Sequence, residues 1–271
     1  MPNVLVCIKR VPGSSGQILL SDDEMSVDPR HVGHTVSPHE ECAVEAAVQV
    51  VSEHGGTATV LTLGPAEALE QLREALAMGV TSAVHVETPD DATGPGSAST
   101  GADAYGPADV AAAIATVAQG RAGAGEGFDL VLLGNDAADT GDFQVGIRLA
   151  FALGWPVVTG VRSFTLVGGV VHAIGDGPVG TEEFEVPLPA VLTVKEGEIS
   201  PRYPSIPGRL KAKKAPVEVI PADPPKHGTA RKRLVLPPEQ PSVVQTLGTD
   251  KDLPAAAAAV LDVLATIGVT R

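Results

Sequence analysis

The stretch from Gly134 to Gly146, GNDAADTGDFQVG, combines residue types that suit a phosphate group. Its glycines and small side chains would let an anion approach the backbone closely. Its acids Asp136 and Asp139 could work as an acid and base pair, but no nucleophile or histidine lies near them in sequence. The stretch therefore indicates ligand binding, and we predict no catalytic residue.

The elements around this stretch predict that it lies at the edge of a sheet. The apolar run 129–133 is typical of a buried parallel strand. From the end of the stretch onward, apolar residues recur at the spacing i, i+4, i+7 and i+8. This spacing predicts one buried helix face made of Phe143, Ile147, Ala150 and Phe151. Anions favour such a junction, because free N–H groups and the helix dipole meet there. The alternative is an ordinary connecting loop with Asp139 or Thr140 as helix cap.

Strand and helix patterns alternate along the first 155 residues. Apolar runs predict strands over 4–8, 58–63, 83–86 and 129–133. Ser37-Pro38-His39-Glu40 has the form of a capping box with proline in the first turn, so a helix is expected to begin there. The alternation predicts a Rossmann-like α/β fold: a mostly parallel open sheet with helices on both faces. Strand-rich segments after Pro156 predict added antiparallel strands.

The carboxyl-terminal part differs in composition. It is rich in proline and basic residues, with a short helix expected within 205–214 and a last helix over Leu253 to Gly268. We therefore expect an α/β nucleotide-binding domain over 1–220, and over 221–271 an extended arm whose helix docks on a partner subunit. The segment 88–106, rich in Gly, Ser, Thr and Asp, is expected to be a flexible surface loop.

Charge is unevenly distributed. The net charge is −14, which argues against nucleic-acid binding. Residues 200–233 nevertheless hold nine of the 19 basic residues and two of the 33 acidic ones. This asymmetry indicates either a contact surface for an acidic partner or a solvated basic face.

Cysteine, histidine and hydropathy patterns exclude several classes of protein. Cys7 and Cys42 form no disulfide framework and are expected to be packed thiols. His31, His34 and His39 lack the spacing of a metal site, so no metal is predicted. No apolar run is long enough to cross a bilayer and no signal peptide is visible, so a cytoplasmic protein without membrane insertion is expected.

The predicted topology brings several loops to one rim. The first, second and fourth strands end at Cys7, Leu63 and Gly134, and the helix start at Ser37 can reach the same edge. Backbone N–H groups from several loops suit a nucleotide phosphate and adenine better than a metal or a peptide.

Seven blocks of the sequence, in order, resemble the electron-transfer flavoprotein beta subunit, from about Val4 to Ile220. They are VLVCIKRVP, SPHEECAVEAAVQV, LGPAEALEQLREALAMG, DLVLLGNDAADTGDFQVG, LGWP, LPAVLTV and PRYPSIPGRLKAKKAPVEV. The last block is specific to that family.

The resemblance implies a heterodimer with an alpha subunit. Its redox FAD lies mainly on alpha and is covered in part by beta, and many beta subunits hold a structural AMP. The heterodimer carries electrons from flavin dehydrogenases, such as acyl-CoA dehydrogenases, to a membrane quinone oxidoreductase. By resemblance the AMP pocket is lined by Cys7, Ser37, Pro38, His39, Glu40, Leu63, Gly134, Asn135, Asp136, Ala137, Asp139, Thr140, Gly141, Asp142, Phe143, Gln144 and Val145.

The resemblance also implies a segment that recognises dehydrogenases, over Arg202 to Leu210. Its docking residues would be Arg202, Tyr203, Ile206 and Pro207, with Ile206 as the anchor. The neighbouring basic residues would steer the chain toward acidic dehydrogenase surfaces.

The chain departs from the usual family pattern at several positions. Ser37 replaces the usual Asn, and Val11-Pro12-Gly13-Ser14 replaces a segment that often touches the flavin. The loop DAADTGDFQVG is similar to that of bifurcating relatives, in which a second FAD occupies the AMP pocket. Two alternatives to the AMP-binding shuttle therefore remain: a bifurcating subunit, and a stand-alone adenine-nucleotide-binding domain of the universal-stress type.

Overall fold

The computed structural model describes residues 1–13, 18–28, 30, 32–92, 101–227, 233–238 and 252–269. The chain divides into two compact units, Met1–Leu234 and Val235–Arg271. Residues 93–100 of the expected loop over 88–106 lie outside the described residues, and so does His31, one of the three histidines for which no metal site was predicted.

A nine-stranded sheet forms the centre of the first unit, in the order β11-β5-β4-β1-β6-β10-β7-β8-β9. All its neighbours pair in parallel except β7 with β8 and β8 with β9, which are antiparallel. This confirms the predicted fold class. The strands are β1 (Asn3–Cys7), β4 (Thr57–Gly64), β5 (Ser82–Glu87), β6 (Leu130–Gly134), β7 (Val157–Val167), β8 (Val170–Gly177), β9 (Gly180–Pro187), β10 (Ala190–Val194) and β11 (Glu218–Pro221).

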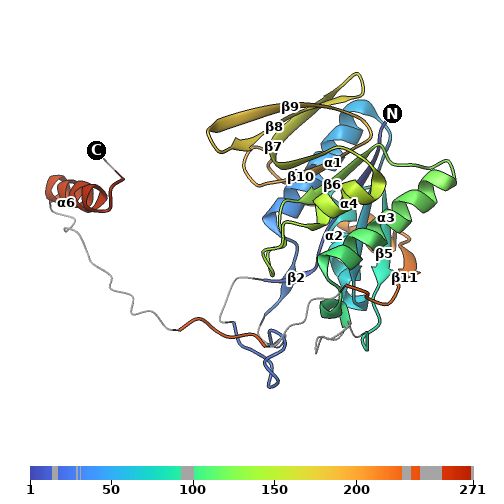
Figure 1. The fold of residues 1–271 in the computed structure, drawn as a ribbon, viewed down its shortest axis with the longest axis horizontal. Helices are drawn as coiled ribbons and strands as arrows, with labels where there is room; N and C mark the ends of the chain where they lie inside the picture. Colours follow the sequence, from blue (N-terminus) through green and yellow to red (C-terminus); the bar gives the residue numbers. More distant parts are fainter. Residues whose placement is uncertain are drawn as a thin grey trace. The chain divides into compact units, whose positions relative to one another are not determined.

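Helices cover both faces of this sheet (Figure 1). The core on one face includes residues of α1 and α2, and the core on the other includes residues of α3 and α4. The helices of the first unit are α1 (Pro38–His54), α2 (Leu69–Met78), α3 (Pro107–Gly123), α4 (Val145–Leu153) and α5 (Ile206–Lys214). Short 3₁₀ turns are η1 (Ala66–Ala68) and η2 (Gly101–Ala104).

The start of α1 follows from its sequence. The Ser37 hydroxyl accepts a hydrogen bond from the Glu40 N–H at 3.3 Å, and the Glu40 carboxylate accepts one from the Ser37 N–H at 3.1 Å. The predicted capping box is therefore confirmed, and it fixes the first turn of the helix.

The predicted buried face of α4 is wrong in most of its members. Phe143, Ile147 and Phe151 are exposed, and only Ala150 of the predicted set is buried. The helix turns Gly146, Leu149 and Ala150 toward the sheet instead. A glycine faces inward because the helix lies very close to β10, so the apolar side chains at i, i+4 and i+8 point outward.

The strand β11 was not predicted. It pairs in parallel with β5 over Glu218–Pro221, although the carboxyl-terminal arm was expected to begin at 221. The chain that follows is held against α3, because the buried Asp109 carboxylate accepts hydrogen bonds from the Gly106, Lys226 and His227 N–H groups. Residues 218–227 thus belong to the packed first unit.

We expect Asp109→Ala to release residues 222–227 from α3. Losing a buried carboxylate with three N–H donors should lower the free energy of unfolding by about 2–3 kcal/mol. Limited proteolysis would cut the variant near residue 227 faster than the wild type, while Asp91→Ala, which removes an exposed carboxylate in the connection from β5 to α3, should be cut at the wild-type rate. Equal cleavage of both variants would contradict the role given to Asp109.

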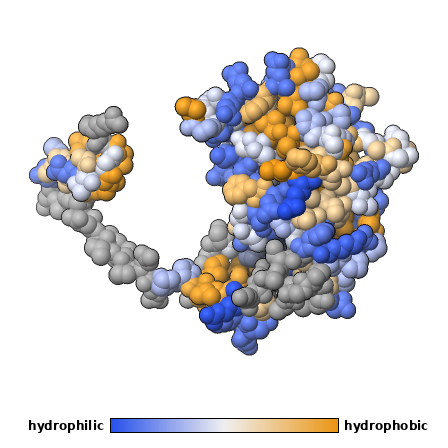
Figure 2. Space-filling model, in the orientation of Figure 1, coloured by the Kyte–Doolittle hydropathy of each residue, from blue (hydrophilic) through white to orange (hydrophobic). Residues whose placement is uncertain are grey.

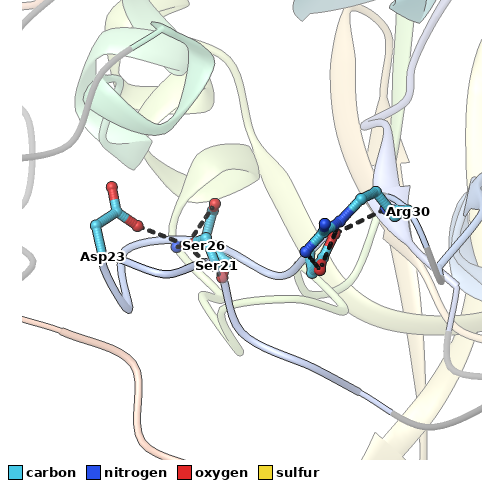
Figure 3. Close-up of polar contacts among 5 residues, drawn as sticks. Ser21, Asp23, Ser26 and Arg30 are labelled. Carbon is cyan, nitrogen blue, oxygen red and sulfur yellow. Dashed lines mark hydrogen bonds and ion pairs between the residues drawn. The ribbon is translucent and has the colours of Figure 1, made fainter.

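The connection between the short paired strands β2 (Val11–Pro12) and β3 (His34–Thr35) folds on itself. The Ser21 hydroxyl donates to the Asp23 carboxylate at 2.6 Å and accepts from the Ser26 N–H at 3.0 Å (Figure 3). The Arg30 guanidinium binds the Asp28 carboxylate at 2.6 Å. Local contacts therefore order the described part of this loop.

The described helix of the second unit is α6 (Leu253–Thr266), which begins at the Asp252 cap close to the predicted position. Val260, Leu261, Val263 and Ile267 are exposed, and Figure 2 shows α6 with an apolar and a polar side. No helix among the described residues is long and apolar enough to span a membrane.

Candidate functional site

The connections from the central strands change direction between β1 and β6. Strand β1 lies between β4 and β6, and the connection through α1 leads to β4 on one side, whereas β6 lies on the other. In an open α/β sheet such a switch point leaves a crevice at the carboxyl ends of the strands, where ligands bind. Cys7 at the end of β1 pairs in register with Leu133, so Gly134 lies directly beside the exit of β1.

Helix α1 approaches this crevice closely. A Cβ atom at Gly134 would lie 2.7 Å from Cγ of Glu40 and 3.4 Å from Cβ of His39. Only glycine fits there. The structure thus brings together the predicted residues of α1 and of the glycine-rich stretch, as the rim prediction required.

Two ion pairs hold the glycine-rich loop to the other side of the crevice. Lys9 Nζ lies 2.7 Å from Asp139 Oδ1, and His39 Nδ1 lies 2.6 Å from Asp136 Oδ1. Each acid therefore has a basic partner, and the two do not form an acid and base pair. Lys9 was not among the predicted site residues, because its partner lies 130 positions away and no local pattern connects them.

The loop itself is a tight turn followed by an open helix end. The Ala137 carbonyl accepts from the Gly141 N–H at 2.7 Å, and the Ala137 N–H donates to the Asp142 carbonyl at 3.0 Å. The N-cap residue of α4 is Gln144, and its side chain makes no capping hydrogen bond. The alternative in which Asp139 or Thr140 caps the helix is therefore wrong, and the N–H groups of the first turn of α4 have no side-chain cap.

Hydrogen bonds connect Asn135, at the start of the loop, to Thr193 on β10 and Gly160 on β7. Asn135 Oδ1 accepts from the Thr193 hydroxyl and the Gly160 N–H, each at 2.8 Å. Thr193 Oγ1 also accepts from the Gly160 N–H at 3.2 Å. Beside this network lies a cavity of about 270 Å³, lined in part by Asn135, Phe143 and Lys195. Thr193 was missed because a threonine inside the apolar strand LPAVLTV gives no signal of its partners.

Two titratable groups of the site are buried. Burial raises the pKa of Glu40 to about 7, although hydrogen bonds from Ser37 and Lys9 act in the opposite direction. Burial, with the nearby Glu40, also raises the pKa of the Cys7 thiol well above its usual range. Cys7 is therefore a packed thiol and not a nucleophile.

The predicted docking residues lie at a different place, on the outer side of α2. Tyr203 is 96% exposed and Ile206 is 77% exposed. Arg202 behaves differently, since its guanidinium makes hydrogen bonds of 2.7 and 2.8 Å to the buried Glu45 carboxylate. Burial opposes ionisation of Glu45, but the hydrogen bonds from Arg202 and Gln49 together outweigh it and lower the pKa of Glu45. Arg202 thus anchors the segment to α1.

Comparison with known proteins decides the family. Residues 25–225 match the family model described as the electron transfer flavoprotein domain. The electron transfer flavoprotein subunit beta of Bacillus subtilis is 35% identical over 221 residues, which is 82% of this chain and 79% of that protein. The chain belongs to the electron-transfer flavoprotein beta-subunit family.

Relatives from distant organisms share the similarity. The human electron transfer flavoprotein subunit beta is 35% identical over 218 residues, 80% of each chain. The Mycobacterium tuberculosis protein of the same name is 33% identical over 225 residues, 81% of this chain and 79% of the relative. The chain is thus an electron-carrier subunit of a flavoprotein, and the name beta subunit implies an alpha partner.

Proposed function

We propose that the crevice between β1 and β6 holds the phosphate and adenine of AMP. The observation that carries this proposal is the first turn of α4, which has no side-chain cap and follows a glycine-rich loop at the switch point of the sheet. Free N–H groups at a helix start bind phosphate. Lys9 adds a positive charge on the facing side, where the His39 ring also lies, while their pairs with Asp139 and Asp136 hold the loop in place.

Other predicted residues have supporting roles in this proposal. Cys7 and Leu63 at the ends of β1 and β4 supply an apolar wall for adenine. The capping box of Ser37 and Glu40 fixes the first turn of α1 beside the loop. Asp136 and Asp139 position the loop.

A second candidate is a bifurcating subunit, in which FAD takes the place of AMP. The loop sequence DAADTGDFQVG favours this alternative. Both ligands carry the same adenine nucleotide moiety, so the same first turn of α4 would bind a phosphate in either case. The matching family model and the similar proteins are electron transfer flavoproteins, so they give no support to a stand-alone regulatory domain.

We also propose that the chain covers an FAD held mainly by the alpha subunit. Exposed apolar side chains support a protein partner. Ile147 and Phe151 on α4 are exposed, as is Phe143 just before the helix, and α6 carries another apolar side. Large exposed apolar patches mark interaction sites. In Figure 2 hydrophobic surface lies beside hydrophilic surface across the face that carries α4.

Co-expression of the chain with an alpha subunit tests this function. A yellow heterodimer whose flavin is reduced by an acyl-CoA dehydrogenase with its substrate, and reoxidised by a membrane quinone oxidoreductase, is the expected result. A chain that forms no heterodimer, or a heterodimer whose flavin accepts no electrons from any flavin dehydrogenase, would contradict the proposed function. Oxidation of NADH with two FAD per heterodimer would select the bifurcating alternative.

We expect Ile206→Ala to weaken docking to the dehydrogenase. An exposed aliphatic anchor that enters a partner's pocket contributes about 2 kcal/mol, so kcat/KM for the coupled reduction should fall about tenfold or more. The heterodimer and its flavin spectrum should not change. Val167→Ala, which truncates another exposed aliphatic residue on β7, is the matched control and should keep wild-type kinetics. If kcat/KM for the coupled reduction were the same in the Ile206→Ala and Val167→Ala variants, Ile206 would have no docking role.

A further inference from the structure

The docking segment, Arg202 to Leu210, has little backbone structure of its own before α5. Residues 200–204 belong to the connection from β10 to α5, and two of them, Pro201 and Pro204, have no N–H group. Within the described residues, the backbone of 200–204 makes no hydrogen bond to another backbone group. Side chains of the neighbouring helices therefore determine where this part of the segment lies.

Helix α1 fixes the start of the segment. The Glu45 carboxylate accepts three hydrogen bonds from Arg202: from its backbone N–H at 3.2 Å, and from Nε and Nη2 of its guanidinium at 2.7 and 2.8 Å. A fourth comes from the Gln49 side chain at 2.8 Å. One turn earlier on α1, the Cys42 thiol donates to the Ile199 carbonyl at 3.1 Å. Helix α1 therefore holds the chain at two points shortly before α5 begins.

Helix α2 fixes the other end of the segment. Arg73 Nη1 donates to the Ala212 and Lys213 carbonyls at 2.7 and 2.9 Å, in the last turn of α5, where a cation is favoured. Gly208 packs so closely on α2 that a Cβ atom there would lie 2.6 Å from the Ala77 carbonyl oxygen. The exposed part of the segment thus lies between two fixed ends.

Glu45 lies too deep to meet a partner protein. Its side chain is 4% exposed, whereas the side chain of Arg202 is 45% exposed. An ionised carboxylate is unfavourable in such a place unless it is paired, and stability alone does not require one, because an apolar side chain could pack there. Any effect of Glu45 on a partner protein must therefore act through Arg202 and the segment that follows it.

We propose that Glu45 is a positioning residue for dehydrogenase docking, and that Arg202 serves this reaction through Glu45 instead of touching the dehydrogenase. This role of Glu45 rests on the proposed function, in which Ile206 docks on the dehydrogenase. A segment that is already held in its binding geometry loses less conformational freedom on docking, so it binds more tightly. A segment that is mobile before docking must be ordered during it, at a cost in entropy. Arg73 acts in the same way from α2.

The coupled reduction measures this role, using the full chain with its alpha partner and the heterodimer as the varied substrate of the dehydrogenase. Glu45→Gln keeps the size of the side chain and removes its charge. The freed guanidinium of Arg202 can turn to solvent, so no unpaired charge stays buried. We expect KM for the heterodimer to rise about fivefold or more and kcat to stay within about twofold. Glu53→Gln, at an exposed position on the same helix, is the matched control and should keep wild-type kinetics.

A second substitution separates positioning from direct contact. Adding Arg202→Gln to the Glu45→Gln variant should raise KM by no more than about twofold further, because Arg202 acts through Glu45. If Arg202 touched the dehydrogenase, Glu45→Gln alone would leave KM unchanged and the added substitution would raise it. Arg73→Met, which removes the donor at the end of α5, should raise KM as Glu45→Gln does.

Two further measurements separate positioning from a loss of fold. Amide hydrogen exchange over 203–210 should be faster in the Glu45→Gln heterodimer than in the wild type, while exchange in β1 and β6 should not change. Reduction of the flavin by dithionite needs no docking and should keep its wild-type rate. If Glu45 only stabilised the fold, Glu45→Gln would lower the thermal midpoint and leave KM of the folded heterodimer unchanged.

Two kinetic results would overturn the proposal. The first is an unchanged KM in Glu45→Gln although Ile206→Ala lowers kcat/KM, in which case the proposed docking function would stand without Glu45. The second is a further rise in KM of about fivefold or more when Arg202→Gln is added, which would show direct contact of Arg202 with the dehydrogenase. Wild-type kinetics in Ile206→Ala would reject the docking segment itself, and the role of Glu45 with it.

Discussion

Gly146→Ala should destabilise the chain by about 2–4 kcal/mol and empty the nucleotide crevice. The added Cβ would lie 2.4 Å from Cγ2 of Thr193, a distance that no packed structure tolerates. Thr193 is buried and cannot rotate freely, because its hydroxyl bonds Asn135 and Gly160. Overpacking costs about 1–3 kcal/mol and the broken network about 1–3 more, which outweighs the gain of about 1 kcal/mol in helix propensity.

Thermal unfolding measures this effect, with a fall of about 5–15 °C expected. The double variant Gly146→Ala with Thr193→Ser should recover most of the loss, since serine removes the colliding methyl group and keeps the hydroxyl. Gly120→Ala on α3 is the matched control: nothing lies within 4 Å of its added Cβ, so it should be neutral or slightly stabilising. A double variant as unstable as the single one would contradict the contact.

Glu40→Gln should remove a pH-dependent contribution of about 3 kcal/mol to the free energy of unfolding. Burial raises the pKa of Glu40 from 4.5 to about 7, so the folded chain binds this proton more tightly than the unfolded chain. The stability due to this group is complete below pH 4.5 and is lost as the pH rises through 7. The gap between the two pKa values corresponds to about 3 kcal/mol. Glutamine keeps an acceptor for the Ser37 N–H and cannot ionise.

Urea unfolding at several values between pH 5 and 8 checks this prediction. The wild type should lose stability relative to Glu40→Gln by about 2–3 kcal/mol across that range. Glu53→Gln, an exposed position near the end of the same helix, should run parallel to the wild type. A constant difference between Glu40→Gln and the wild type would show that Glu40 ionises in the folded chain as it does in the unfolded one.

Local signals in the sequence determine part of this structure. The capping box of Ser37 and Glu40 depends on residues three positions apart, so the start of α1 could be predicted. The central strands are continuous apolar runs, because parallel strands buried on both faces need them. Their alternation with helices predicted the sheet, and its rim predicted where α1 and the loop from Gly134 meet.

Features that depend on distant contacts could not be predicted. The inward face of α4 depends on the close approach of Gly146 to Thr193, whereas hydrophobic periodicity assigns an inward face to large side chains. The strand β11 is short and largely exposed, and only its pairing with β5 defines it. The pair of Lys9 and Asp139 joins residues that lie 130 positions apart in the sequence.

The nucleotides released from the purified heterodimer test the central claim most directly. We predict that the denatured heterodimer releases, besides the FAD of alpha, one further adenine nucleotide per beta chain, and that this nucleotide is AMP. The Gly146→Ala variant should lose that nucleotide and keep the FAD of alpha. A wild-type heterodimer that releases one FAD and no other adenine nucleotide would contradict the assignment of the crevice between β1 and β6.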